Sequence, residues 1–326
     1  MVTSKEVAKL AGVSISTVSR VFSRPDKVNE KTKEKVLRIA EELHYIPDIT
    51  AKSLKLNKSN IIGMVIPDIS NPFYLLAAKE LSNTGGYERK FYITFSQENA
   101  TNEFNSIVSL IGSKVDIIIF TPVNNSNESV ESYLNANKVP AIQVYRRMYD
   151  NLDSLVIDDA YGTYLATKEL LKNGHKDIVL FDYKLSIPTH REEGYIKAFE
   201  EFGLKYNKDN IIKSTFDDDF YSVIKEAIET KKPTGVIPCG ILYIDALRKY
   251  LRNNGVKIKK DISIVSYDDT DISKALNLTT ISHPFMKITE SINNIINTRL
   301  SNTPTKAIHS VIKPFLISRD SIAKIN

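Results

Sequence analysis

Residues 2–21, which read VTSKEVAKLAGVSISTVSRV, restrict the fold of this chain more than any other segment. Thr3 followed by Glu6 is the pattern of a capping box, which predicts that a helix begins directly after Thr3. Gly12 can adopt the left-handed conformation that ends a helix, and Ser14 can cap a second helix directly afterwards. Two short helices joined by so tight a turn are typical of a helix-turn-helix.

The second helix is predicted to bury Val18 and Val21 and to present the other side to solvent. Its outward residues would be Ile15, Ser16, Ser19 and Arg20. In a helix-turn-helix this surface lies in the major groove of DNA. An ordinary helical hairpin is the alternative, but Asn29 can cap a third helix over about residues 30–43. Three helices in so short a stretch favour a small separate domain.

The distribution of charge agrees with a DNA-binding segment at the N-terminus. The chain has 326 residues and a net charge of +5. Residues 1–60 hold 12 Lys/Arg against 7 Asp/Glu, whereas the rest of the chain holds 32 of each sign. Because all the excess positive charge lies in one small piece, we expect that piece to bind phosphates.

From about residue 60, short β-branched runs alternate with helical stretches, which predicts parallel sheets covered on both faces. The predicted strands are 61–66, 91–95, 115–120, 141–145, 155–157, 178–181, 236–237 and 262–265. So many strands exceed one comfortable sheet, so we expect two similar sub-domains that face each other. Ligands in such folds bind beyond the carboxyl ends of the strands, here in a shared cleft.

The N-terminal runs AGVSISTVSRV, VNEKTKEKV and LHYIPDITAKSL resemble the LacI/GalR family of bacterial transcription regulators. The similarity continues in DISNPFY, REEGY, DISIVSYDDT and LTTISHP. The resemblance implies an α/β fold with a three-helix helix-turn-helix headpiece (1–47) and a hinge helix (48–58). Two Rossmann-like parallel-sheet sub-domains of periplasmic-binding-protein type would follow (59–326).

The resemblance also implies three crossings between the sub-domains, near Asp158, near Pro284 and in the C-terminal segment. The N-sub-domain would then comprise about 59–157 plus 285–313, and the C-sub-domain about 158–284 plus 314–326. This body would bind the effector and form the homodimer.

For DNA, the resemblance implies base contacts from Ile15, Ser16 and Arg20, and Arg20 suits bidentate recognition of guanine. Phosphate contacts would come from Ser14, Thr17, Ser19, Asn29 and Thr32. In the hinge, Leu54 would insert between base steps in the minor groove, and Ala51 would allow close approach. The partner would be a palindromic double-stranded operator.

For the effector, the resemblance points to Phe73, Arg191, Phe216 and Asp268. Arg and Asp can form paired hydrogen bonds to sugar hydroxyls, and aromatic rings can stack on sugar C–H surfaces. The chain departs from the family's sugar binders at Gly240-Ile241 and at Tyr145-Arg146, which also become candidates. These departures favour a sugar phosphate or another unusual sugar over a plain hexose, because Arg suits phosphate.

The sequence therefore predicts a DNA-binding transcription regulator, expected to be a repressor of a carbohydrate-utilisation operon under a sugar or sugar-phosphate effector. One alternative is a catabolite-control-type regulator with a protein co-repressor, and another is a plain solute-binding protein. We expect no enzyme, since no Gly-rich phosphate loop, metal-ligand spacing or nucleophile elbow is present. No cofactor or metal is expected. Cys239 is the single cysteine, and no apolar signal core or membrane span is evident, which favours the cytoplasm.

Overall fold

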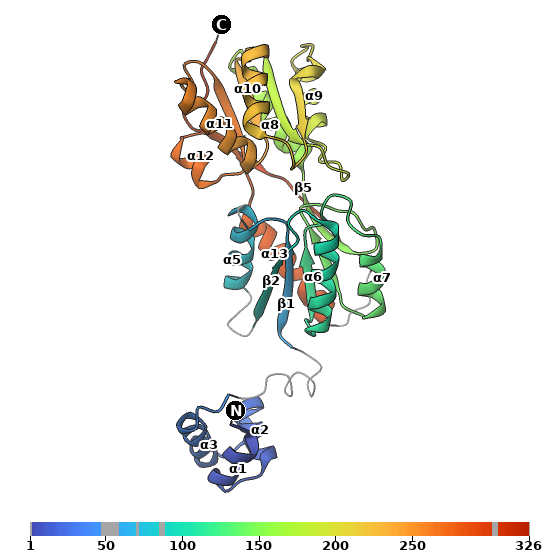
Figure 1. Cartoon of the computed structure of the whole chain (residues 1–326), viewed down its shortest axis with the longest axis vertical. Coiled ribbons are helices and arrows are strands. Elements are labelled where there is room, and N and C mark those ends of the chain that lie inside the picture. The colour runs from blue at the N-terminus through green and yellow to red at the C-terminus, as the bar shows by residue number, and fades with distance from the viewer. Residues whose placement is uncertain (1, 47–58, 70–71, 85–88, 302–305, 326) are drawn as a thin grey trace. The chain divides into compact units, whose positions relative to one another are not determined.

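The computed structural model describes residues 2–46, 59–69, 72–84, 89–301 and 306–325. The chain divides into two compact units, Met1–Asn60 and Ile61–Asn326, which we call the headpiece and the body (Figure 1). Each unit is described by itself. The predicted hinge helix, with Ala51 and Leu54, lies outside the described residues.

The described part of the headpiece contains three α-helices, α1 (Ser4–Ala11), α2 (Ile15–Ser23) and α3 (Glu30–Glu42), and a 3-10 turn, η1 (Pro25–Lys27). The capping box predicted at Thr3 and Glu6 is confirmed, and Gly12 ends α1 in the left-handed conformation at φ 66°. The buried residues come from all three helices. They are Val7, Ala8, Ala11, Val18, Val21, Val36, Ile39 and Ala40. The small alanines among them allow the helices to approach closely.

The body contains two six-stranded sheets, and we call the two lobes built on them the N-lobe and the C-lobe. The N-lobe sheet has the order β11-β5-β4-β3-β1-β2, and every pairing in it is parallel. Its strands are β1 (Ile61–Ile66), β2 (Lys90–Phe95), β3 (Ile117–Phe120), β4 (Ala141–Val144), β5 (Asp153–Ile157) and β11 (His309–Ile312). Its helices are α5 (Pro72–Thr84), α6 (Ala100–Gly112), α7 (Ser129–Ala136) and α13 (Phe285–Leu300).

The C-lobe sheet has the order β12-β10-β9-β8-β6-β7 and is parallel except for the antiparallel pair of β12 with β10. Its strands are β6 (Ile178–Tyr183), β7 (Ile211–Ser214), β8 (Gly235–Pro238), β9 (Ser263–Tyr267), β10 (Thr279–Ser282) and β12 (Phe315–Ile317). Its helices are α8 (Asp159–Lys172), α9 (Arg191–Glu201), η2 (Lys208–Asn210), α10 (Phe220–Lys231), α11 (Ile241–Asn254) and α12 (Asp271–Ala275).

The chain passes between the lobes after β5, after β10 and between β11 and β12. Each lobe is therefore assembled from segments that are far apart in the sequence. The predicted fold class, a helix-turn-helix followed by two parallel-sheet sub-domains, is confirmed for the described residues.

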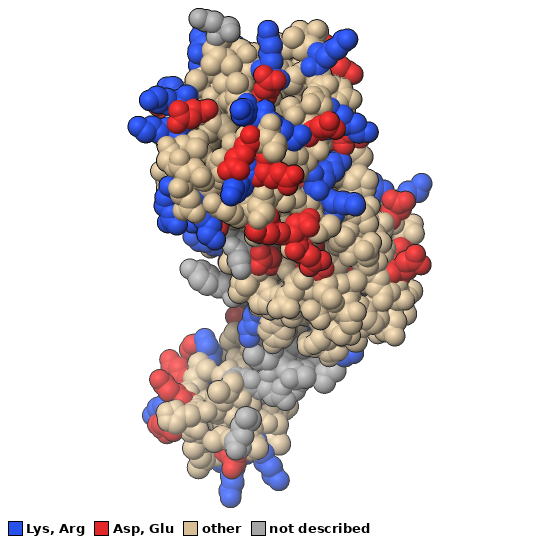
Figure 2. Space-filling view, turned by 45° about the horizontal axis from the view of Figure 1, so that its top comes forward, with Lys and Arg blue, Asp and Glu red and all other residues tan. Residues whose placement is uncertain are grey.

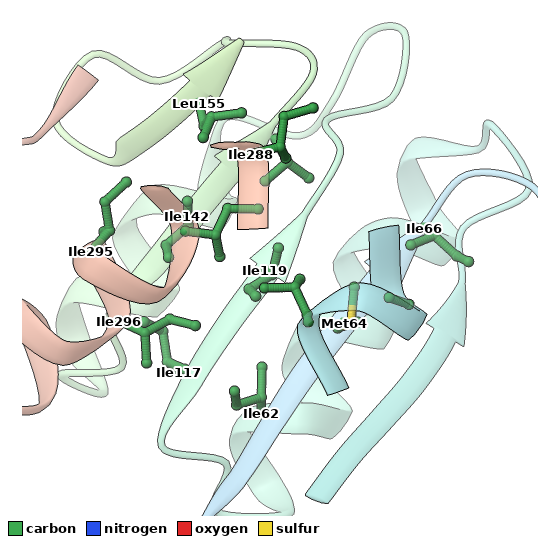
Figure 3. Packing of buried hydrophobic residues seen from close by; sticks show 14 of the residues in the cluster. Ile62, Met64, Ile66, Ile117, Ile119, Ile142, Leu155, Ile288, Ile295 and Ile296 are labelled. Atoms are coloured by element: carbon green, nitrogen blue, oxygen red, sulfur yellow. The ribbon is translucent and has the colours of Figure 1, made fainter. Parts of the chain in front are cut away.

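Both faces of the N-lobe sheet are buried, because alternate residues of each strand point to opposite sides. On one face, Ile62 and Met64 pack against α5 and α13 (Figure 3). On the other face, Ile61 and Val65 pack against α6 and α7. This two-sided burial explains why the strand reads as an unbroken apolar run, IIGMVI, whose burial is complete along its length.

Four observed strands, β7, β10, β11 and β12, are not predicted by the sequence pattern. Three of them are short strands at sheet edges: β7 and β11 contain polar residues that break the apolar run, and β12 is only three residues long. β10 is buried but carries hydroxyl side chains, which its neighbours satisfy. Thr279 Oγ1 donates to the carbonyl of Arg319, and Thr280 Oγ1 donates to that of Ser266. Tertiary hydrogen bonds of this kind leave no pattern in the sequence.

Two glycines let α8 and α9 pack unusually closely in the C-lobe. A Cβ atom at Gly194 on α9 would lie 1.8 Å from the carbonyl oxygen of Ala160 on α8. A Cβ atom at Gly162 on α8 would lie 2.3 Å from the hydroxyl oxygen of Tyr267. Since the first obstacle is backbone, the helices must separate if Gly194 gains a side chain. This packing fixes the N-termini of both helices.

We expect Gly194→Ala to destabilise the body by about 1–3 kcal/mol, the usual cost of overpacking a tight interface. The free energy of unfolding is to be measured by urea denaturation. The matched control is Gly112→Ala at the end of α6, where an added Cβ meets no atom within 4 Å. Equal stability of the two variants would contradict the close packing of α8 and α9.

Candidate nucleic-acid interface and ligand cleft

The exposed surface of α2 carries the residues that the sequence singles out for contacts with bases. Ile15 is 49% exposed, and Ser16, Ser19 and Arg20 are exposed as well. The guanidinium of Arg20 has no hydrogen-bond or ion-pair partner among the described residues. A long cation held outward by a packed helix can therefore reach a partner outside the chain.

The first turn of α2 is ordered by a small cluster of hydroxyl groups. Ser14 Oγ accepts from the backbone N–H of Thr17 at 3.1 Å and lies 2.7 Å from Ser16 Oγ. Asn29 caps α3 in the same manner, through the N–H of Lys31 at 3.1 Å. The two helix N-termini carry partial positive charge, so Ser14 and Asn29 lie where helices bind phosphate. Thr17 and Thr32 are half-buried beside these caps.

A cleft of about 740 Å³ lies between the carboxyl ends of the two sheets in the body. Most residues that line it lie at the ends of strands or in the segments that follow them, as expected for a doubly wound fold. Five predicted effector residues line it: Tyr145, Arg146, Arg191, Phe216 and Asp268. The side chain of the sixth, Phe73, lies outside the described residues. The volume is that of pockets that bind drug-sized ligands.

Arg191 at the start of α9 is held by two carboxylates that are not among the effector residues predicted from the sequence. Its Nη1 lies 2.9 Å from Asp182 Oδ1, and its Nη2 lies 3.3 Å from Asp159 Oδ2. The guanidinium also lies over the ring of Tyr267, 4.6 Å from its centroid. The guanidinium is thus part of the wall, and of its nitrogens only Nε has no partner among the described residues.

The two carboxylates are themselves anchored. Asp159 accepts from the hydroxyl of Tyr267 at 2.6 Å, and Asp182 accepts from Thr189 at 2.7 Å. Burial raises the pKa of Asp159, while Arg191 and the Tyr267 hydroxyl oppose that rise. Asp182 stands at the end of an apolar strand. Because polar residues at strand ends are candidates for ligand contacts, the reasoning that identifies Asp268 from the sequence also identifies Asp182. No local signal marks Asp159.

Asp268 follows β9 and points its carboxylate at a buried histidine. His283 Nε2 donates to Asp268 Oδ1 at 2.7 Å. Asp268 has φ 73°, a left-handed conformation that is uncommon outside glycine but best tolerated by Asp and Asn. Its backbone oxygen accepts from Thr270 N–H and from Thr280 Oγ1, which fixes this strained turn. The carboxylate therefore has one orientation set by the fold.

Arg146 lies on the opposite lobe and is also neutralised. Its guanidinium makes two hydrogen bonds to Glu98, at 2.9 and 2.8 Å, and a third to the carbonyl of Pro122 at 3.2 Å. Glu98 lines the cleft as well but is not predicted from the sequence. The preceding residue, Tyr145, has φ 68° and packs its ring against Tyr74, with 5.8 Å between centroids.

Gly240, which stands where the family's sugar binders carry a polar residue, allows an aromatic wall. Its φ is 114°, and a Cβ atom there would lie 2.5 Å from the hydroxyl oxygen of Tyr183. Tyr183 in turn stacks on Phe216 with 5.0 Å between ring centroids and 26° between planes. A side chain at position 240 would thus occupy the space that Tyr183 fills, so the absence of one allows the aromatic surface of the C-lobe to form.

Outside the cleft, the surface of the body carries mixed charge. On the face in Figure 2, Lys and Arg side chains are interspersed with Asp and Glu over the body. This agrees with the equal numbers of the two signs beyond residue 60. Among the described residues, no helix is long and apolar enough to cross a bilayer.

The loop at residues 121–127 contacts the other lobe. The N–H of Asn125 donates to Ser186 Oγ at 3.0 Å, and Ser186 N–H donates back to the side chain of Asn124. Beneath this loop, Glu103 on α6 is fully buried and accepts from the N–H of Val123 at 3.0 Å. Glu103 thus supports a contact between the lobes.

The hydrogen bonds beneath this loop can all form at once when Glu103 is protonated. Glu103 Oε2 is hydrogen-bonded to Ser126 Oγ, which lies 2.7 Å from the Tyr149 hydroxyl, and that hydroxyl lies 2.7 Å from the carbonyl oxygen of Asn127. The two hydroxyl groups supply only two protons for three contacts, and the chain ends on an oxygen that can only accept. A carboxylic acid supplies the third. Burial raises the pKa of Glu103 to about 7.

The body should therefore lose stability as pH rises from about 4.5 through 7. The folded pKa lies above the ordinary value of 4.5, so the folded state binds the extra proton and ionisation costs up to about 3 kcal/mol. Glu103→Gln should remove this loss, because the amide can donate to Ser126 and accept from Val123. Urea denaturation between about pH 5 and 8 measures it.

Glu200→Gln, an exposed site on α9, serves as the control and should follow the wild-type profile. A Glu103→Gln profile parallel to that of the wild type over the whole range would show that Glu103 is ionised in the folded state.

Comparison with known proteins agrees with this arrangement. The family described as "Bacterial regulatory proteins, lacI family" matches residues 3–48, and "Periplasmic binding protein-like domain" matches residues 167–322. The HTH-type transcriptional repressor PurR of Histophilus somni is 29% identical over 334 residues, covering 99% of each protein.

Two solved structures share the fold. The lac repressor dimer bound to operator and the anti-inducer ONPF has a TM-score of 0.80 at 23% identity and covers 99% of each chain. The transcriptional regulator CelR–cellobiose complex has a TM-score of 0.72 at 21% identity, covering 98% of this chain and 100% of that one.

Proposed function

This chain belongs to the lacI family of bacterial regulatory proteins and is a DNA-binding regulator of transcription, and on that premise we propose that it is a repressor under the control of a carbohydrate in the cleft. The observation that carries the effector proposal is the cleft itself. Aromatic rings from both lobes and fixed polar groups converge there at the carboxyl ends of two parallel sheets. This combination suits a ligand that has both C–H surfaces and hydroxyls.

We propose that α2 of the headpiece reads a palindromic operator in the major groove. Support comes from the exposed Ile15, Ser16 and Arg20 and from the excess of positive charge in residues 1–60. Ser14, Thr17, Ser19, Asn29 and Thr32 would contact phosphates. The hinge at residues 48–58, with Ala51 and Leu54, would bind the minor groove.

A palindromic site requires two copies of the headpiece, which we propose the body brings together as a homodimer. Exposed apolar side chains on the N-lobe support this assignment. Leu75 on α5 and Tyr92 and Ile93 on the edge strand β2 are all exposed. The protein would act on the chromosome, and hence in the cytoplasm.

The effector would act by shifting the angle between the lobes. Three chain crossings and the contact of Asn124 and Asn125 with Ser186 join the lobes, so a ligand that touches both changes their relative orientation. Such coupling is reciprocal, and the operator must change the effector affinity by the same factor.

The structure narrows the effector class. From the sequence alone, Arg146 and Arg191 suggest a sugar phosphate as the effector. In the cleft, however, both guanidiniums are already bound to carboxylates. A phosphate would have to displace Glu98 or Asp159, so we propose a sugar that carries no phosphate.

We expect Arg20→Ala to weaken operator binding by about 1–3 kcal/mol per half-site and to relax the preference at one symmetric base pair. The measurement is a binding titration against the operator and against variants of it at fixed salt. The control is Arg38→Ala on α3, which also removes one exposed charge from the headpiece. The control should change affinity equally for all sequences. Unchanged base preference in Arg20→Ala would contradict the proposed orientation of α2.

Removal of one aromatic ring from the cleft should weaken binding of the effector without changing the affinity for the operator. We expect Phe216→Ala to lower affinity for the stabilising sugar by about tenfold or more, since a stacked ring contributes on the order of 1 kcal/mol beyond its buried area. Thermal shift against a panel of neutral, amino and phosphorylated sugars identifies that sugar. Phe202→Ala, a half-exposed ring outside the cleft, is the control. Equal ligand affinity in the two variants would contradict the site.

A further inference from the structure

Every arginine that lines the cleft is already paired with a carboxylate. Arg191 is shared by Asp159 and Asp182, and Arg146 is bound to Glu98 by two hydrogen bonds. At the rim, Arg147 is 2.7 Å from Asp150. No lysine lines the cleft among the described residues. The cleft therefore offers no cationic side chain that is not already neutralised.

Carboxylates outnumber these cations. Asp268 on the C-lobe wall is a further carboxylate beside those that pair with the arginines. Only Oδ1 of Asp268 is hydrogen-bonded, to His283, and its Oδ2 has no hydrogen-bond partner among the described residues. Covering this carboxylate with a ligand is costly unless the ligand compensates its charge.

The aromatic wall favours the same sign of ligand charge. Ring faces attract cations as well as sugar C–H groups. In the cleft, the guanidinium of Arg191 already lies over the ring of Tyr267. The stacked rings of Tyr183 and Phe216 lie in the same cleft. A cation between Asp268 and these rings would interact favourably with both.

From this balance we infer that the effector carries a protonated amine, and that the cleft is built for an amino sugar. The inference rests on the proposed function of the cleft as a carbohydrate site. The cleft, at about 740 Å³, is far too large for a bare metal ion, and the described residues contain no group of side chains that could hold one. The amine would lie against Asp268, and the ring hydroxyls and C–H faces would meet the polar and aromatic walls.

The first experiment compares sugars that differ only in charge. Isothermal titration of the full chain uses glucosamine and the glucosamine disaccharide, each beside its N-acetylated form, which keeps the ring but has no positive charge. Glucose and glucose 6-phosphate complete the set. We expect an amine-bearing member to bind about tenfold or more tighter than its N-acetylated form, because a charge-assisted hydrogen bond is about twice as strong as a neutral one.

The second experiment uses Asp268→Asn. Asn tolerates the left-handed backbone and can still accept from His283, so the fold should persist. The variant should bind the amine-bearing and the N-acetylated sugars about equally. The control is Asp271→Asn, a fully exposed site that does not line the cleft and should keep the wild-type preference.

Two outcomes would overturn the inference. One is that no amine-bearing sugar binds, and the other is that neutral or phosphorylated sugars bind as tightly as the amines. If neutral sugars alone bind and also shift operator affinity, the proposed carbohydrate control remains and only the charge assignment fails. If operator binding responds to no sugar that binds, the proposed control itself fails.

Discussion

The guanidinium of Arg191 holds together the strand ends on which the C-lobe half of the cleft is built. It joins the start of α9 to the end of β6 through Asp182, to the start of α8 through Asp159, and to the end of β9 through Tyr267. Buried carboxylates without this cation would be left uncompensated, at a cost of about 3–5 kcal/mol when one partner of such a pair is removed. The close approach of α8 and α9 at Gly194 brings these groups within reach of one another. The charge balance of the cleft therefore depends on the close packing of α8 and α9.

The headpiece and the order of elements follow from local sequence patterns, because caps and apolar spacing act within a few residues. Thr3, Ser14 and Asn29 cap the helices that the sequence predicts for them. The location of the cleft follows from topology, since Tyr145 and Asp268 come directly after strands. The partners of Arg191 do not follow from local patterns, because Asp159 and Asp182 reach it only through tertiary packing.

The chemical character of the cleft shows the same limit of the sequence. Read along the chain, Arg146 and Arg191 indicate affinity for phosphate. In space each is neutralised, and the sign of the local charge reverses. The charge of a site depends on which groups the fold brings together. Glu103 is a second example, since burial among hydroxyl groups from separate segments raises its pKa.

The interleaved lobes also bear on how the protein is made. Residues 4–42 contain helices α1, α2 and α3, so the core that these helices form is complete as soon as this segment leaves the ribosome. The N-lobe sheet, in contrast, lacks its last strand until residues 309–312 are synthesised, and α13 reaches its core only shortly before. Domains generally fold in order of synthesis. A nascent chain would thus hold a folded headpiece well before it has a cleft, and the ability to bind DNA would arise before the ability to sense a ligand.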